Sequence, residues 1–74
     1  MEADLLSRVE INPKIMFGKP VIGGTRLTVE LVLEKLAQGY THEKLIGEYP
    51  FLTEEGIRAS LMYAAKSLSV SGIV

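Results

Sequence analysis

The sequence predicts a mainly α fold, in which a short N-terminal β ribbon precedes a core of three helices. Three observations support this fold class. Alternating and glycine-rich stretches occupy residues 5–27, whereas apolar residues recur at helical spacing after Thr28. A threonine precedes each of three helical segments, where its side-chain oxygen can cap the first turn. About four residues separate the second segment from the third, which is typical of a helix-turn-helix unit.

The chain has the length of one small domain, expected to span residues 1–74. We expect a β arm and hinge over about 6–27, a three-helix core over about 28–68 and a tail over 69–74. The 74 residues are 47% hydrophobic and include no cysteine. A core of this size is marginal, and no disulfide can reinforce it. We therefore expect a homodimer.

The ends of the chain predict no membrane segment. Residues 1–4 are acidic and no apolar run reaches the length of a membrane span. The absence of cysteine fits a reducing compartment. We expect a cytoplasmic protein.

Two short strands are expected in the arm. Residues 5–11 alternate, with Val9 and Ile11 on the apolar side, and Asn12-Pro13 ends this strand with a turn. A second strand is expected over 19–22. Such a ribbon is barely stable by itself, so it must pack on the helices, on the ribbon of a partner, or on both.

The glycine-rich stretch 18–26 is interpreted as a structural hinge. Pro20 restricts the backbone before the β-branched pair, and Gly24 permits the positive φ of a sharp reversal. The hinge residues are Gly18, Pro20, Gly24, Thr25 and Arg26. A glycine-rich surface loop with incidental charges is the alternative. A phosphate loop is disfavoured, because Gly18, Gly23 and Thr25 fall in register but Gly24 stands where that motif needs its lysine.

The three helices are expected over about 29–38, 42–49 and 54–66 or 68, with Gly39 ending the first and Pro50 the second. Leu31 falls off the apolar stripe of the first helix; it is interpreted either as a single exposed leucine, which is common, or as a second buried face at a subunit contact. The core face of the third helix is expected to contain Ile57, Leu61, Ala64, Ala65 and Leu68.

The charge distribution predicts weak DNA binding. The net charge is −1, but residues 8–26 hold four cations and one acid. Candidate DNA contacts are Lys19, Arg26 and Arg58. The third helix begins with Glu54 and Glu55, which disfavour a phosphate backbone, so the arm cations are expected to contribute more than Arg58.

No catalytic arrangement is recognisable, and we expect neither an enzyme nor a cofactor or metal. His42 is the single histidine, and none of the serines stands at a sensible spacing from it.

Several motifs together resemble the small prokaryotic domain of unknown function 433. Its hallmark is matched by Gly18-Lys19-Pro20-Val21-Ile22-x-Gly24-Thr25-Arg26-Leu27. The similarity continues through Leu36-Ala37-x-Gly39, Glu48-Tyr49-Pro50-x-Leu52-Thr53 and Leu61-x-Tyr63-Ala64. The chain departs from the family at Gly23, where arginine is common, and at Gly56, where an acid is usual.

This resemblance implies a homeodomain-like trihelical core and an antitoxin-like role, in which the chain neutralises a PIN-type nuclease toxin and binds its own operator. The alternative is a homodimeric interaction module of helix-turn-helix shape without DNA binding. Candidate partner contacts are Met62, Tyr63, Leu68, Val70 and Ile73. The apolar tail is interpreted either as a strand added to a partner sheet or as a frayed terminus.

Overall fold

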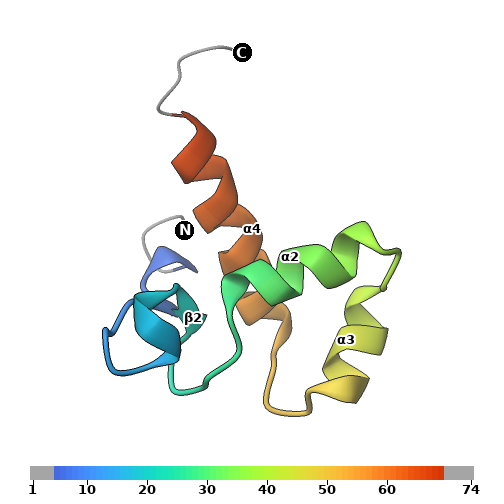
Figure 1. The fold of residues 1–74 in the computed structure, drawn as a ribbon. Helices are drawn as coiled ribbons and strands as arrows, with labels where there is room; N and C mark the ends of the chain where they lie inside the picture. Colours follow the sequence, from blue (N-terminus) through green and yellow to red (C-terminus); the bar gives the residue numbers. More distant parts are fainter. Residues whose placement is uncertain (1–4, 70–74) are drawn as a thin grey trace.

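The structure, a computed structural model, describes residues 5–69 (Figure 1). A β arm precedes three helices, which confirms the mainly α fold class. The elements in chain order are β1 (Val9–Glu10), the 3-10 turn η1 (Met16–Gly18), β2 (Val21–Ile22), α2 (Val29–Ala37), α3 (His42–Glu48) and α4 (Glu54–Ser69). Within this part of the chain, no helix is both long and apolar enough to cross a bilayer.

Each of the three helices begins at the threonine that the sequence predicts. The Thr28 hydroxyl accepts a hydrogen bond from the Leu31 amide at 3.1 Å. Thr41 and Thr53 do the same for the amides three residues ahead, at 3.0 and 3.1 Å. Each cap satisfies an amide that has no partner inside its helix.

The helices end close to their expected positions. Gln38 is the C-cap of α2, and Gly39 follows it with φ +100°, a backbone conformation that glycine adopts at little cost. The α3–α4 turn buries Leu52 to 1% exposure. In the same turn, the rings of Tyr49 and Phe51 meet edge to face with centroids 6.1 Å apart.

The β ribbon is shorter than predicted. Strands β1 and β2 are antiparallel, with Val9 opposite Ile22 and Glu10 opposite Val21. Ile11, expected to face the core with Val9, is instead 59% exposed. Its strand stops at Glu10 because a turn begins at Asn12, whose side chain accepts a hydrogen bond from the Lys14 amide at 2.9 Å.

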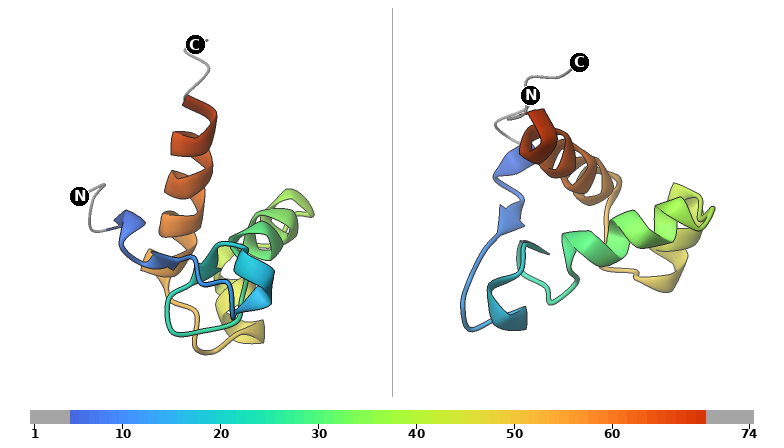
Figure 2. Two further views of the ribbon diagram at one scale, coloured as in Figure 1. Left: turned by 60° about the vertical axis from the view of Figure 1, so that its left-hand side comes forward. Right: turned by 45° about the horizontal axis from the view of Figure 1, so that its top comes forward.

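The arm is held by the chain's own helices (Figure 2). Strand β2 pairs with β1 on one side, and on the other side an isolated bridge joins Val21 to Thr28. The Pro20 carbonyl accepts a hydrogen bond from the Val29 amide at 2.9 Å. Since Val21 is fully buried, the ribbon forms a layer of the core.

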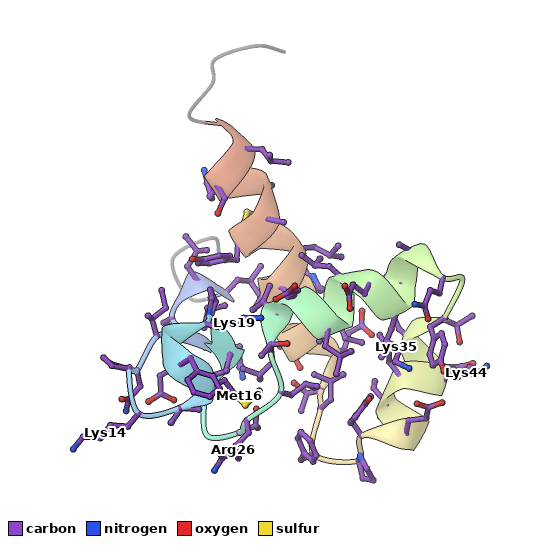
Figure 3. All side chains as sticks on the ribbon, viewed as in Figure 1. Lys14, Met16, Lys19, Arg26, Lys35 and Lys44 are labelled. Carbon is purple, nitrogen blue, oxygen red and sulfur yellow. The ribbon has the colours of Figure 1, made fainter. Side chains whose placement is uncertain are left out.

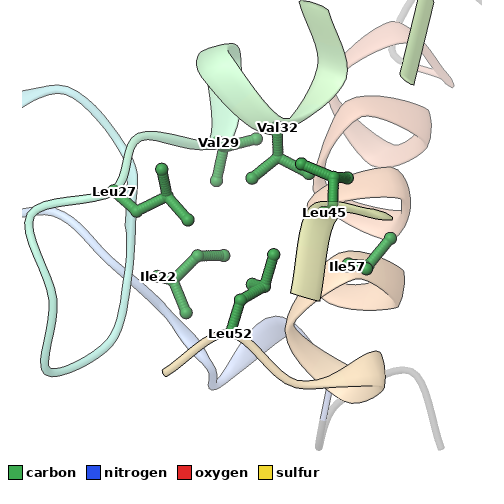
Figure 4. Close-up of a cluster of buried hydrophobic side chains, with 7 residues drawn as sticks. All are labelled: Ile22, Leu27, Val29, Val32, Leu45, Leu52 and Ile57. Carbon is green, nitrogen blue, oxygen red and sulfur yellow. The ribbon is translucent and has the colours of Figure 1, made fainter. Parts of the chain in front are cut away.

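One hydrophobic cluster joins the arm to the helices (Figure 4). It contains Ile22, Leu27, Val29, Val32, Leu45, Leu52 and Ile57. Leu31, which falls off the helical stripe, is half-buried against this cluster. Its position therefore does not require a subunit contact.

The predicted core face of α4 is wrong beyond the first two turns. Ile57 is fully buried, but Leu61 and Leu68 are 44% and 74% exposed. The buried residues beside Ile57 are Ala59 and Ser60, and the Ser60 hydroxyl donates to the Gly56 carbonyl at 3.1 Å. The end of α4 extends past the other helices (Figure 1), whereas Met62, Tyr63 and Ala64 in its middle are half-buried.

Candidate interaction surfaces

The hinge residues build the turn that connects the arm to α2. Gly24 has φ +78°. The Thr25 amide donates to the Ile22 carbonyl at 3.0 Å, which closes the reversal. The Thr25 hydroxyl donates to the same carbonyl at 2.7 Å and accepts from the Leu27 amide at 3.0 Å. The Thr25 hydrogen bonds all stay within the turn. Gly24 and Thr25 therefore stabilise the backbone conformation of this reversal.

The two positions that depart from the family pattern are both crowded. A Cβ atom at Gly23 would lie 3.2 Å from the Arg8 carbonyl oxygen, which already accepts the Gly23 amide at 2.7 Å. A Cβ atom at Gly56 would lie 3.0 Å from a methyl group of the buried Leu52. In this chain, therefore, a larger residue at either position would require its neighbours to shift.

The cations of the arm point in different directions (Figure 3). Lys19 forms an ion pair with Glu30 of α2 at 3.1 Å. Lys14 and Arg26 are exposed and point away from the helices at the far edge of the arm. Of the two arm residues expected to contact DNA, Arg26 is therefore the more available.

A strained turn lies just before the hinge. Met16, Phe17 and Gly18 all have positive φ, at 48°, 58° and 82°, and the Phe17 side chain is 96% exposed. Positive φ costs a residue other than glycine about 1–3 kcal/mol. The sequence contains no turn signal at Met16 or Phe17, so this conformation was not predicted.

The start of α4 carries an acidic surface. Glu54 and Glu55 occupy its first turn, and a Glu54 carboxylate oxygen lies 2.8 Å from Nδ1 of His42 on α3. Arg58 is exposed one turn further along. Arg58 thus lies one turn after the carboxylates of Glu54 and Glu55 on the same helix. It is distant in sequence from Lys19 and Arg26 of the arm.

Two lysines surround Tyr40 in the loop between α2 and α3. The ammonium groups of Lys35 and Lys44 lie 4.9 and 4.4 Å from its ring centroid. A hydrogen bond between the Lys35 ammonium and the Tyr40 hydroxyl, 3.5 Å long, raises the pKa of Lys35 above its usual value. Because Lys35 belongs to α2 and Lys44 to α3, their contacts with Tyr40 connect the end of α2 to the start of α3.

Three apolar surfaces flank the second half of α4. One lies against the arm and is lined by Leu6, Val9, Ile11 and Tyr63 with Lys66 and Ser67. Another, here called the α2–α4 groove, is lined by Pro20, Val29, Leu33, Tyr63, Ala64 and Leu68. The third, here called the outer face, is lined by Leu5, Arg58, Leu61, Met62 and Ala65. Of the candidate partner contacts, Tyr63 and Leu68 lie in the groove and Met62 on the outer face. Val70 and Ile73 lie outside the described residues.

Residues 5–69 bring together no group of three histidine, cysteine, aspartate or glutamate side chains that could hold a metal ion. The surfaces that these residues do offer are apolar or charged.

Comparison with known proteins agrees with the fold. A protein of Sinorhizobium fredii named "Uncharacterized protein y4eO" is 38% identical over 64 residues, which cover 82% of this chain and 29% of that protein. A crystal structure of a DUF433 member protein from Anabaena variabilis matches with a TM-score of 0.78 at 28% identity, over 86% of this chain and 63% of that one. The chain therefore spans less than two thirds of the length of either relative.

A family match covers most of the chain. Residues 9–64, from β1 into the exposed half of α4, match the family described as "Protein of unknown function (DUF433)". This range contains the hinge, the core and the three helix caps. The chain belongs to the DUF433 family.

Proposed function

We propose that the chain is an antitoxin-like protein that binds a PIN-type nuclease toxin through the α2–α4 groove. The groove is the observation that carries this proposal. Its walls are apolar, and it lies between two helices whose relative position is fixed by the core. Concave apolar surfaces with a polar rim are typical binding sites for the apolar face of a partner helix or for an extended segment.

The polar rim of the groove supports a protein partner. Glu30 and Ser67 border the apolar residues, and the Glu30 carboxylate is already neutralised by Lys19. A segment that inserts apolar side chains between Leu33 and Ala64 fits this surface. A cytoplasmic location belongs to the same proposal, because an antitoxin must meet its toxin inside the cell.

The test is co-purification with the product of the neighbouring gene, which this proposal expects to be a PIN-type nuclease, using Ala64→Glu. Ala64 is a half-buried groove residue, so a glutamate there would place a charge against the partner's apolar side chains. We expect recovery of the nuclease to fall by about tenfold or more. The matched control is Ala37→Glu, the same substitution at an exposed position of α2, which should keep full recovery.

Equal recovery with Ala64→Glu and wild type, when both are folded by circular dichroism, would rule out the groove as the toxin contact. An adjacent reading frame without a nuclease-like acidic cluster would count against the toxin itself. The alternative function, a homodimeric interaction module without DNA binding, would then be favoured.

Operator binding by the isolated chain is predicted to be weak. Glu54 and Glu55 lie where a recognition helix normally offers cations or amides, and Lys19 is engaged by Glu30. In a gel shift on the chain's own upstream DNA at about 0.15 M salt, we expect affinity no better than about 1 µM. Arg26→Ala should weaken it more than Lys19→Ala or Arg58→Ala. Tight binding that survives both arm substitutions but is lost with Arg58→Ala would contradict this prediction.

A further inference from the structure

The outer surface of α4 carries a row of residues with the spacing of a coiled-coil seam. Arg58, Leu61, Ala65 and Leu68 follow one another at intervals of three, four and three residues, which is the alternation of a and d positions in a heptad. All four are exposed, and Leu61 and Leu68 are two of the large exposed apolar side chains of the described chain. We call this row the outer seam.

A seam of this kind requires a second helix. Three of its four residues are apolar, and Leu5 and Met62 extend the apolar surface beside it. On another side of the same helix, Ala59 and Ser60 are already buried in the core. A helix that is apolar on both sides is normally covered on both sides.

We propose that a second copy of this chain covers the outer seam, with the two α4 helices packed antiparallel. In antiparallel pairs, a positions of one helix lie opposite d positions of the other. Here that rule places Leu61 opposite the partner's Ala65, and Arg58 opposite the partner's Leu68. The seam is thus complementary to itself, and the small side chain of Ala65 leaves room for Leu61.

The single charge in the seam selects the orientation. A parallel pair would place Arg58 directly beside the partner's Arg58, and two like charges in contact repel. In the antiparallel register, residue 58 of one helix lies level with residue 68 of the other. The two Arg58 residues are then about 15 Å apart along the axis, which exceeds the screening length of about 8 Å at physiological salt. Each Arg58 can lay its aliphatic stem on the partner's Leu68 and keep its guanidinium in water.

The small size of the domain also favours a second copy of the chain as the partner that covers the outer seam. Within residues 5–69 the core is one small hydrophobic cluster, and domains of this size often gain buried area by association. Strand β2 of the arm is already paired on both sides, so it has no free edge for a strand of the second copy.

The first test is the mass of the protein in solution by light scattering after size exclusion. Wild type is expected to approach twice the 8.1 kDa mass of the chain as its concentration rises through the micromolar range. Ala65→Glu should elute as a folded monomer, because it places a charge against Leu61 in both halves of the seam. Ala37→Glu should remain dimeric. A wild type that stays monomeric at high micromolar concentration, or a fully dimeric Ala65→Glu, would overturn the proposal.

The second test resolves the orientation by disulfide trapping, since the chain has no cysteine of its own. Disulfides form only when the two Cα atoms are about 4.4–6.8 Å apart. Arg58→Cys and Leu68→Cys should each fail to cross-link alone, and a mixture of the two should cross-link on mild oxidation. Homodisulfides in either variant alone would indicate a parallel pair, and a mixture that stays reduced would indicate no pairing in this register. Either result would overturn the antiparallel seam.

The seam and the α2–α4 groove share Leu68, so they are tested separately at Ala64, which lines only the groove, and at Ala65, which belongs only to the seam. Ala64→Glu should lose the nuclease and remain a dimer, whereas Ala65→Glu should lose the dimer first. If one proposal fails, the other can still be tested, because nuclease recovery and dimer mass are measured on different variants.

Discussion

Replacing Leu45 with alanine is expected to lower the free energy of unfolding by about 2–5 kcal/mol. Leu45 is completely buried and is the contribution of α3 to the central cluster. Its removal leaves a cavity between α2, α3 and the α3–α4 turn that the surrounding backbone can only partly fill. Because a chain of 74 residues has a total stability of about 4–11 kcal/mol, this one change could unfold it. Urea denaturation followed by circular dichroism measures the difference.

The matched control for this prediction is Leu45→Met, which nearly conserves the side-chain volume. It should cost less than about 1.5 kcal/mol, because methionine can adapt to the same space. If Leu45→Ala and Leu45→Met lose stability equally, the loss cannot come from a cavity. The position of α3 against the core would then have to be reconsidered.

The helix boundaries were predictable because local signals determine them. Thr28, Thr41 and Thr53 each cap the turn that follows, and Gly39 adopts the positive φ that ends α2. These effects depend on side chains within three or four residues. A single sequence is sufficient to recognise them.

The exposed half of α4 was not predictable from its apolar pattern. The apolar spacing predicts which side of α4 carries Leu61 and Leu68. It does not show how far along α4 the other elements of the fold extend. The core fully buries only the first turns of α4, Tyr63 still packs against it, and Leu61 and Leu68 remain largely exposed. The same pattern therefore describes a core face near Ile57 and an exposed face near Leu68.

The candidate sites were predicted less well than the helices, because they depend on contacts distant in sequence. The pairing of Lys19 with Glu30 joins the arm to α2 across eleven residues, and it changes which arm cation is available. The left-handed conformation of Met16 and Phe17 occurs in a turn closed by backbone hydrogen bonds, in which the Gly18 and Lys19 amides donate to the Ile15 and Met16 carbonyls. Neither residue has an intrinsic preference for that conformation.

Replacing Gly24 with valine is expected to destabilise the fold by about 1–3 kcal/mol. Gly24 has φ +78°, and a Cβ atom at this position would meet nothing within 4 Å. The cost therefore arises from the backbone alone, because a β-branched residue strongly disfavours positive φ. The turn would have to open, and the Thr25 hydrogen bonds to the Ile22 carbonyl would be lost with it. Thermal unfolding monitored by circular dichroism measures the effect.

A matched control isolates this backbone effect, because the chain offers a second glycine with open space around it. Gly47 lies inside α3, and a Cβ atom there would also meet nothing within 4 Å, but its φ is not in the positive range. Gly47→Val should be neutral or slightly stabilising, since valine has a higher helix propensity than glycine. Gly24→Asn should lie between wild type and Gly24→Val, because asparagine tolerates positive φ better than valine does. Equal melting temperatures for wild type and Gly24→Val would show that the reversal can form without positive φ at residue 24. A loss as large in Gly47→Val would instead point to the valine side chain itself, and not to the conformation of the hinge.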